Sequence, residues 1–293
     1  MGSWVAIGVP IDSSGRPGGT ELAPAALRAH GLPAALGARD DGDLAPRVRG
    51  DARDPATGLI DPDGVVAVTA AVREAVRAVA AAGDRPLLLG GCCTLVPGAL
   101  AGLRDAGGRV GVAYVDGHVD VYDGRTSPTG EAADMPLGVA LGREPAGWAA
   151  AAGGTAVDAA DVVVLGARDP EEAADVAPLL TGELAALEVL GPQALRSQGP
   201  AAAGRAAAAR LAAGPGRFFV HLDVDVLDEA AMPATDYLLP GGLEWEELAA
   251  LLAPLGAADG LAGLSIACLN PEKDAGGACT ARTAALVARA LAG

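Results

Sequence analysis

The chain has 293 residues, of which 51% are hydrophobic, so it contains enough apolar material for a sizeable folded core. It carries 37 acidic against 21 basic side chains, and this net charge of −16 argues against nucleic acid or an anionic membrane as a partner. Neither a signal peptide nor a membrane-spanning apolar run is evident, and 4 cysteines are too few for a disulfide framework. We therefore expect a cytoplasmic protein with reduced thiols that acts on a small molecule.

Apolar runs of strand length alternate with longer helical stretches along the whole chain, and no linker divides them. The predicted strands are Trp4–Val9, Pro86–Leu89, Val110–Val115, Val162–Leu165, Leu187–Leu190, Phe218–Leu222 and Leu261–Ala267. The predicted helices are Pro24–His30, Pro62–Ala82, Leu95–Ala106, Pro170–Leu180, Ala201–Ala213, Trp245–Leu255 and Ala278–Leu291. Continuous apolar strands separated by helices indicate a parallel sheet with helices on both faces. We expect one α/β domain over residues 1–293, with Arg39–Asp63 as a polar surface excursion.

Three side chains that can bind a metal follow directly after the predicted strand Val110–Val115. They are Asp116, His118 and Asp120, in a D-x-H-x-D motif. Residues two apart on an extended segment face the same side, so the three can converge on one point. This motif alone is equally well explained as the end of a strand, where polar side chains emerge into solvent.

A second predicted strand, Phe218–Leu222, ends in carboxylates at the same alternation, Asp223 and Asp225. The carboxyl ends of strands in an open parallel sheet are where ligands collect. Clustered carboxylates without a counter-charge would repel one another, whereas two divalent cations would neutralise them. Oxygen ligands with a single imidazole favour manganese, and a compact two-metal site activates water for hydrolysis.

These motifs, taken together, resemble the arginase/agmatinase (ureohydrolase) family. The N-terminal block Gly18–Arg28, the D-x-H-x-D motif, Asp223-Val224-Asp225, Gly241-Gly242-Leu243 and Asn270-Pro271 occur in the family's order. The resemblance implies an arginase-like three-layer α/β/α fold with a mainly parallel sheet of about eight strands. It also implies two divalent cations, manganese foremost, and a homo-oligomer, either a trimer or a hexamer.

The same resemblance implies a role for each metal-competent residue. Asp116 and Asp223 would bridge the two ions, Asp120 would join them on one ion, and His118 and Asp225 would complete the other. Asp120 would also help to orient the attacking water.

The chain departs from the family where a Gly-Gly-Asp-His motif would supply a further histidine ligand. The corresponding residues are Gly90-Gly91-Cys92-Cys93, so Cys93 stands at the histidine position. This is similar to Nω-hydroxyarginine amidinohydrolase, a divergent branch of the family. A thiolate can bind a metal but shifts preference toward zinc, iron or cobalt, with nickel also open. Alternatively, Cys92 and Cys93 are small buried residues beneath the site, and His221 is a hydrogen-bonded core histidine rather than a ligand.

Two further departures affect the substrate. Ala133 aligns with the family's proton-shuttling histidine, and Cys268 aligns with the glutamate that holds the guanidinium group. Thr129, Glu131 and Glu171 align with or near contacts to the other end of the substrate, where Glu131 would favour an amine. Alternatively, Glu131 and Glu171 are solvated charges at the rim.

Three hypotheses follow. The first is a metal-dependent hydrolase of a linear amidine or guanidine-type C–N bond, whose substrate bears an amine and is not arginine. The second is a non-catalytic binding or assembly subunit that keeps the fold but has a degenerate site. The third is thiol chemistry by Cys268 in a metal-poor site.

Overall fold

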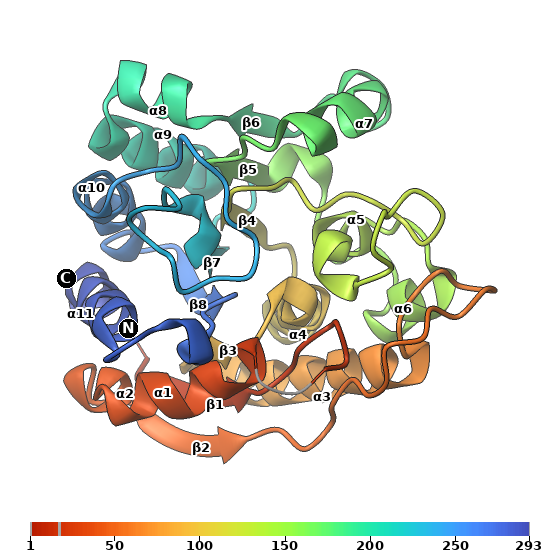
Figure 1. Ribbon diagram of the computed structural model, residues 1–293. Coiled ribbons are helices and arrows are strands. Elements are labelled where there is room, and N and C mark those ends of the chain that lie inside the picture. Colours follow the sequence, from red (N-terminus) through yellow and green to blue (C-terminus); the bar gives the residue numbers. More distant parts are fainter. Residues whose placement is uncertain (1, 17–18, 293) are drawn as a thin grey trace.

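The structure is a computed structural model that describes residues 2–16 and 19–292. Within these residues a parallel sheet contains eight strands in the order β2-β1-β3-β8-β7-β4-β5-β6, which runs from bottom to top in Figure 1. The strands are β1 (Trp4–Val9), β2 (Arg39–Asp43), β3 (Arg85–Gly90), β4 (Gly111–Val115), β5 (Val162–Leu165), β6 (Glu188–Leu190), β7 (Phe218–Asp223) and β8 (Leu261–Ala267).

Helices cover both faces of this sheet and complete a three-layer α/β/α fold (Figure 1). One face packs against α1 (Ala23–Ala29), α2 (Leu32–Ala35), α8 (Pro192–Gln198), α9 (Pro200–Ala213), α10 (Trp245–Gly256) and α11 (Ala278–Leu291). The other face packs against α3 (Pro62–Ala81), α4 (Val96–Gly107), α5 (Pro136–Ala140), α6 (Ala146–Ala151) and α7 (Pro170–Thr181). No helix in the described part of the chain combines the length and hydrophobicity that a bilayer-spanning helix needs.

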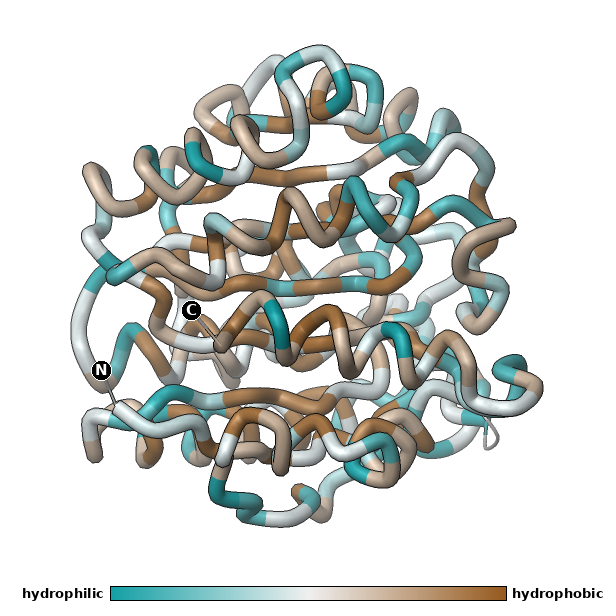
Figure 2. The backbone as a smooth tube through the Cα atoms, turned by 90° about the vertical axis from the view of Figure 1, so that its left-hand side faces the viewer, coloured by the Kyte–Doolittle hydropathy of each residue, from teal (hydrophilic) through white to brown (hydrophobic). Residues whose placement is uncertain are grey.

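Side chains along each strand alternate between the two helical layers. In β1, for example, Val5 and Ile7 pack in the layer of α3–α7, whereas Trp4 and Ala6 pack in the opposite layer. Because both faces are covered, the central strands are mainly apolar, and Figure 2 shows brown stretches in the interior of the molecule. The same alternation places Tyr114 of β4 and Phe219 of β7 in the layer of α3–α7.

The predicted fold class, parallel sheet and long elements are confirmed, and their ends shift by at most one residue. The interpretation of Arg39–Asp63 as surface excursion alone is wrong at its start, because Arg39–Asp43 forms the edge strand β2 beside β1. All five residues of β2 are exposed, so the segment lacks the apolar pattern that predicts a strand. Backbone pairing and the ion pairs of Arg28 with Asp40 and Asp43 hold it in place.

Four short helices, α2, α5, α6 and α8, were not among the predicted elements. Each contains seven residues or fewer, about two turns at most, which is too short to show a helical periodicity of apolar residues.

Helices α3 and α4 approach each other closely at two glycines of α4. A Cβ atom at Gly102 would lie 2.5 Å from the backbone oxygen of Arg73 and 2.9 Å from Cβ of Val76. A Cβ atom at Gly98 would lie 2.6 Å from the backbone oxygen of Thr69. Real Cβ atoms do not approach backbone this closely, so the missing side chains set the distance between the two helices.

We predict that Gly102→Ala lowers the free energy of unfolding by about 1–3 kcal/mol, because overpacking outweighs the better helix propensity of alanine. The matched control is Gly147→Ala in α6, where a Cβ atom would meet nothing within 4 Å and the change should be neutral or stabilising. Denaturant unfolding of both variants checks this, and equal effects would contradict the close packing.

Candidate metal centre and active site

The carboxyl ends of β3, β4, β7 and β8 meet at a cavity of about 120 Å³. The structure brings together here every residue to which the sequence assigned a site role, although the roles themselves stay predictions. These residues line the cavity: Cys93, Asp116, His118, Asp120, Thr129, Glu131, Glu171, Asp223, Asp225 and Cys268. Ala133, which the resemblance aligns with a proton-shuttling histidine, lines it as well.

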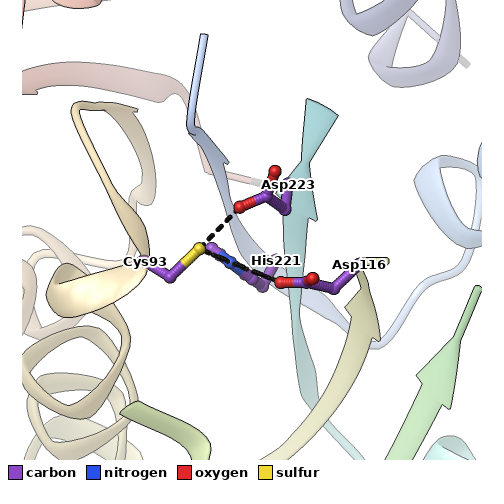
Figure 3. A group of neighbouring side chains, drawn as sticks. All are labelled: Cys93, Asp116, His221 and Asp223. Carbon is purple, nitrogen blue, oxygen red and sulfur yellow. Dashed lines mark hydrogen bonds and ion pairs between the residues drawn. The ribbon is translucent and has the colours of Figure 1, made fainter. Parts of the chain in front are cut away.

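A first group of potential ligands lies deepest and is fully buried. It comprises Cys93, Asp116, His221 and Asp223, whose ligand atoms all lie within 4.8 Å of one another (Figure 3). The Cys93 thiol donates to Oδ2 of Asp223 at 2.7 Å and lies 3.8 Å from Oδ2 of Asp116. Nε2 of His221 lies 3.3 Å from the same sulfur. Cys93 therefore lies within reach of the other three members of this group.

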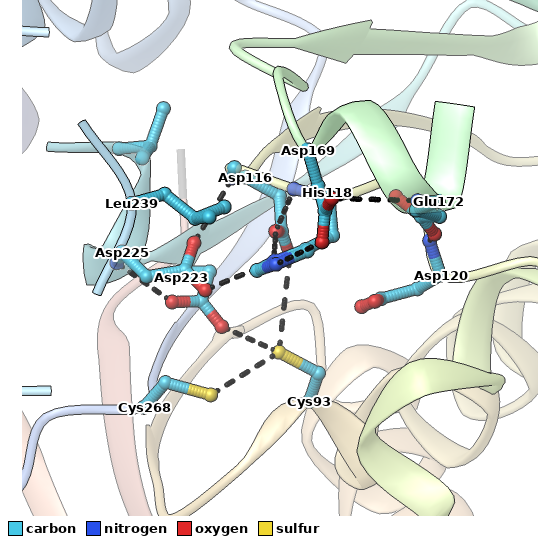
Figure 4. Close-up of polar contacts among 12 residues, drawn as sticks. Cys93, Asp116, His118, Asp120, Asp169, Glu172, Asp223, Asp225, Leu239 and Cys268 are labelled. Atoms are coloured by element: carbon cyan, nitrogen blue, oxygen red, sulfur yellow. Dashed lines mark hydrogen bonds and ion pairs between the residues drawn. The ribbon is translucent and has the colours of Figure 1, made fainter. Parts of the chain in front are cut away.

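A second group, Asp116, His118 and Asp225, lies nearer the cavity mouth. Nδ1 of His118 is 3.1 Å from Oδ2 of Asp225 and 3.5 Å from Oδ1 of Asp116. Asp116 belongs to both groups, which is the arrangement that a carboxylate bridging two cations requires (Figure 4). The backbone N–H of Gly117 donates to Oδ1 of Asp225 at 2.9 Å and ties the two strand ends together.

Asp120 lines the cavity but belongs to neither group. Its Oδ2 accepts a hydrogen bond of 2.5 Å from the Tyr114 hydroxyl, and its backbone has a positive φ of 57°. Glu172, at the start of α7, accepts from the backbone N–H groups of both Val119 and Asp120 at 2.7 Å. The buried Glu172 carboxylate therefore fixes the backbone that presents the second half of the D-x-H-x-D motif.

The buried carboxyl groups carry more negative charge than their surroundings offset. Burial, with the charge of Asp225, raises the pKa of Asp116 to about 6 and also raises the pKa of Asp223. Burial, with the charge of Asp116, raises the pKa of Asp120. Burial acts in the same direction on Asp225, but the charge of His118 outweighs it and lowers the pKa of Asp225. A site with this imbalance favours bound cations.

The pKa values of the two histidines of the site shift in opposite directions. Burial disfavours the His118 cation, but Asp225 and Asp116 outweigh burial and raise the pKa of His118 well above its usual value. Burial lowers the pKa of His221 to about 3, so its imidazole is neutral at physiological pH. Nδ1 of His221 is 2.7 Å from the hydroxyl oxygen of Ser265 on β8. A buried, hydrogen-bonded histidine is what the sequence favoured, but its contact with Cys93 also places it among the potential ligands.

Cys268 lies next to the first group rather than among the potential ligands. Its sulfur is 3.5 Å from the Cys93 sulfur, and its backbone has a positive φ of 61°. The backbone N–H of Cys268 donates to the carbonyl of Gly91 at 2.6 Å, which joins the end of β8 to the turn after β3. Cys92, by contrast, is buried and contacts the Thr94 hydroxyl at 3.2 Å, as expected for a small buried residue.

Residues at the cavity mouth make it acidic. Glu131 accepts a hydrogen bond of 2.9 Å from the Tyr237 hydroxyl, and burial raises the pKa of Glu131. The Thr129 hydroxyl donates to Asp134 at 3.0 Å. Glu171 is exposed at the first turn of α7, as a rim charge would be. Glu131 is thus fixed in place, whereas Glu171 lies at the edge.

Sequence reasoning missed several residues that shape the site. The sequence assigned no role to Tyr114, Arg168, Glu172 or Tyr237. Arg168 donates to the backbone carbonyls of residues 225 and 227 and so holds the loop after β7. The sequence signals for these residues are weak. Tyr114 lies within an apolar strand, and Glu172 resembles any acidic residue at the start of a helix.

A model of the arginase family matches residues 3–293. The chain is 28% identical to the arginase of Agrobacterium fabrum over 293 residues, 96% of this chain and 87% of that protein. It is 32% identical to the formimidoylglutamase of Halobacterium salinarum over 239 residues, 80% of this chain and 71% of that protein. The solved arginase of Bacillus caldovelox superposes with a TM-score of 0.90 at 25% identity, covering 100% of this chain and 99% of that one. The chain therefore belongs to the arginase family.

Proposed function

We propose that this protein is a metal-dependent hydrolase that cleaves a C–N bond in a linear amidine or guanidine-type group of an amine-bearing substrate other than arginine. The observation that carries the proposal is the pair of potential ligand groups that share the buried Asp116 at the floor of a cavity. Relatives named as arginases and as a formimidoylglutamase support the same class of reaction.

The donor set fits two divalent cations. Asp116, Asp223 and Asp225 supply carboxylate oxygens, His118 an imidazole and Cys93 a sulfur, all within ligand reach of a neighbour in the set. Oxygen donors suit manganese, and the sulfur opens the site to zinc, iron, cobalt or nickel. Bound cations would neutralise the carboxylates, polarise the substrate and bring the pKa of water near neutrality.

The reaction adds the oxygen of water to the amidine carbon, breaks its bond to the amine nitrogen and delivers a proton to that nitrogen. Asp120, held by Tyr114 at the cavity wall, is placed to orient the water. Ala133 offers no proton to the leaving nitrogen, and loss of a general acid commonly costs about 10²–10⁴-fold in rate. We therefore expect slow turnover, or a leaving group that needs little protonation.

Two features of the cavity select the substrate. Cys268 presents a thiol where the resemblance implies a guanidinium-binding glutamate, so a neutral or smaller group suits that end. Glu131 and Glu171 give the mouth a negative charge that favours an amine. The pairing of a small amidine with a distant amine is distinct from arginine, whose far end also carries a carboxylate.

A second candidate function is a non-catalytic binding or assembly subunit, which Ala133 and Cys268 favour because both replace groups the family uses in catalysis. Assembly as a homo-oligomer, a trimer or hexamer, is part of both proposals. A hydrolysis assay distinguishes the two functions, because only the first predicts turnover of a substrate.

The central test is hydrolysis by metal-stripped protein that is reloaded separately with manganese, zinc, iron(II), cobalt or nickel. We expect release of an amine from small amidines or formimidoyl amines with at least one of these metals, and slower release of urea from arginine and agmatine. Mass spectrometry of substrate and product measures all of them in one assay. No hydrolysis with any metal would favour the non-catalytic subunit, and fast cleavage of arginine would refute the roles of Ala133 and Cys268.

Asp223→Ala should lose both ions, because the bridging role proposed for this carboxylate serves each of them. Elemental analysis of the purified, metal-loaded variant measures the loss. Asp259→Ala removes an exposed carboxylate that does not line the cavity, and it should retain the metal content of the parent. An Asp223→Ala protein with full metal content would show that the assignment of Asp223 is wrong.

Cys268→Glu should raise the affinity for guanidines such as agmatine by at least about tenfold. A carboxylate provides a charge-assisted hydrogen bond to a guanidinium, which a neutral thiol cannot. Cys268→Ser keeps the position small and neutral, and it should bind guanidines as weakly as the parent does. Titration calorimetry compares the three proteins, and equal binding by the Cys268→Glu variant and the parent would place Cys268 outside the substrate pocket.

A further inference from the structure

We propose that the deeper cation is held by a mixed set of Cys93, His221, Asp116 and Asp223, in which His221 supplies an imidazole from within strand β7. This set selects zinc, iron(II) or cobalt over manganese. The inference rests on the proposed metal-dependent function and adds the identity of the ligands and the class of ion at the deeper position.

The distances between the four ligand atoms fit one small cation. With bonds of roughly 2.0 to 2.3 Å to a common tetrahedral ion, ligand atoms lie roughly 3.3 to 3.6 Å apart. Nε2 of His221 is 3.3 Å from the Cys93 sulfur and 3.8 Å from Oδ2 of Asp116, and that sulfur is 3.8 Å from the same oxygen. The shorter distance of 2.7 Å, from sulfur to Asp223, is a thiol hydrogen bond whose proton a cation would replace.

The backbone places His221 one step below the carboxylates on the same face of the sheet. His221 and Asp223 are two apart on β7, so both point toward the layer of α3–α7. The strand register pairs His221 with Tyr114 on β4 and with Ser265 on β8, which forms a row beneath the site. The Tyr114 ring lies against the imidazole, with a centroid distance of 4.6 Å.

This row orients the imidazole as a metal ligand. Nδ1 of His221 is 2.7 Å from the Ser265 hydroxyl, so a proton on Nδ1 is satisfied there and the lone pair of Nε2 points to Cys93 and Asp116. Metal-binding histidines characteristically use their second nitrogen in this way. All three side chains of the row are fully buried, so the orientation is held by packing as well.

One carboxylate oxygen of Asp120, which the resemblance assigns to one of the ions, takes part in another contact. Its Oδ2 accepts the 2.5 Å hydrogen bond from Tyr114, and it belongs to neither ligand group. The mixed set therefore supplies four donors without it. Relative to the family's pattern, a thiol replaces an imidazole at position 93. In this set His221 supplies an imidazole from strand β7.

The ligand chemistry determines the choice of ion. Thiolate and imidazole donors favour zinc, iron(II) and cobalt, whereas manganese favours carboxylate and water oxygens. A single thiolate in the set therefore gives a direct spectroscopic signature, because a sulfur bound to cobalt(II) produces a charge-transfer band in the near ultraviolet.

The first experiment titrates metal-free protein with cobalt(II) alone. We expect the near-ultraviolet sulfur-to-cobalt band and visible bands of tetrahedral intensity with the first equivalent. Cys93→Ser should abolish the near-ultraviolet band, while Cys268→Ser and Cys279→Ser should keep it. Cobalt bound without a sulfur band would overturn the proposal, as would a band that disappears with Cys268 instead.

The second experiment isolates the imidazole without altering the buried core. The chain contains three histidines, His30, His118 and His221, and only His221 is fully buried. In the untagged double variant His30→Asn/His118→Asn, X-ray absorption of one equivalent of zinc should still show imidazole scattering together with one sulfur. Because His221 is the only histidine left, absence of imidazole scattering would overturn its assignment.

A third measurement tests the orienting hydroxyl and the choice of ion. Ser265→Ala should weaken zinc binding by about 10–100-fold, as loss of a hydrogen bond to a ligand typically does. Cys93→His should raise the affinity for manganese relative to zinc. Unchanged zinc affinity in Ser265→Ala and unchanged selectivity in Cys93→His would each contradict the mixed set.

Absence of any metal binding would overturn both proposals, whereas hydrolysis with cobalt that lacks a sulfur band would overturn only this one.

Discussion

The burial of several carboxylates at one point is the constraint on which the rest of this structure depends. Asp116, Asp120, Asp223 and Asp225 leave adjacent strands β4 and β7 at the same edge, and all four are nearly inaccessible to solvent. Their mutual repulsion and loss of hydration oppose ionisation, and within the described site His118 and Arg168 are the cations that their pKa values reflect. Such a cluster is a potential cation-binding site, because bound cations would offset the repulsion among the carboxylates.

Much of the surrounding architecture holds this cluster in place. Glu172 reaches from α7 to the backbone after β4, and Arg168 holds the loop after β7 by its carbonyls. Gly117 permits the close approach of these two segments, because a Cβ atom there would lie 2.7 Å from the Arg168 guanidinium and 2.9 Å from Oδ1 of Asp225. The charged residues of the site are therefore positioned by Glu172, Arg168 and Gly117, and of these three Glu172 also lines the cavity.

Three residues on which the metal and substrate proposals depend form one connected region. Cys93 and Cys268 contact each other at 3.5 Å, and Cys93 also contacts His221. These three positions lie on different segments yet form one patch, so the changes in ligand type and in substrate contact occur side by side. The fold beneath this patch is similar to that of the solved Bacillus caldovelox arginase.

The sequence by itself determined the parallel sheet, its two helical layers and the two strand ends that carry carboxylates. These follow from local patterns: apolar runs mark buried strands, and residues two apart share a face. Edge strand β2 was not predicted, because its exposed residues carry no apolar pattern. Only the tertiary structure decided that Cys93 meets Asp223, 130 residues away, and that His221 contacts the same sulfur. The physical reason is that the register between strands sets these contacts, and no spacing within one segment encodes that register.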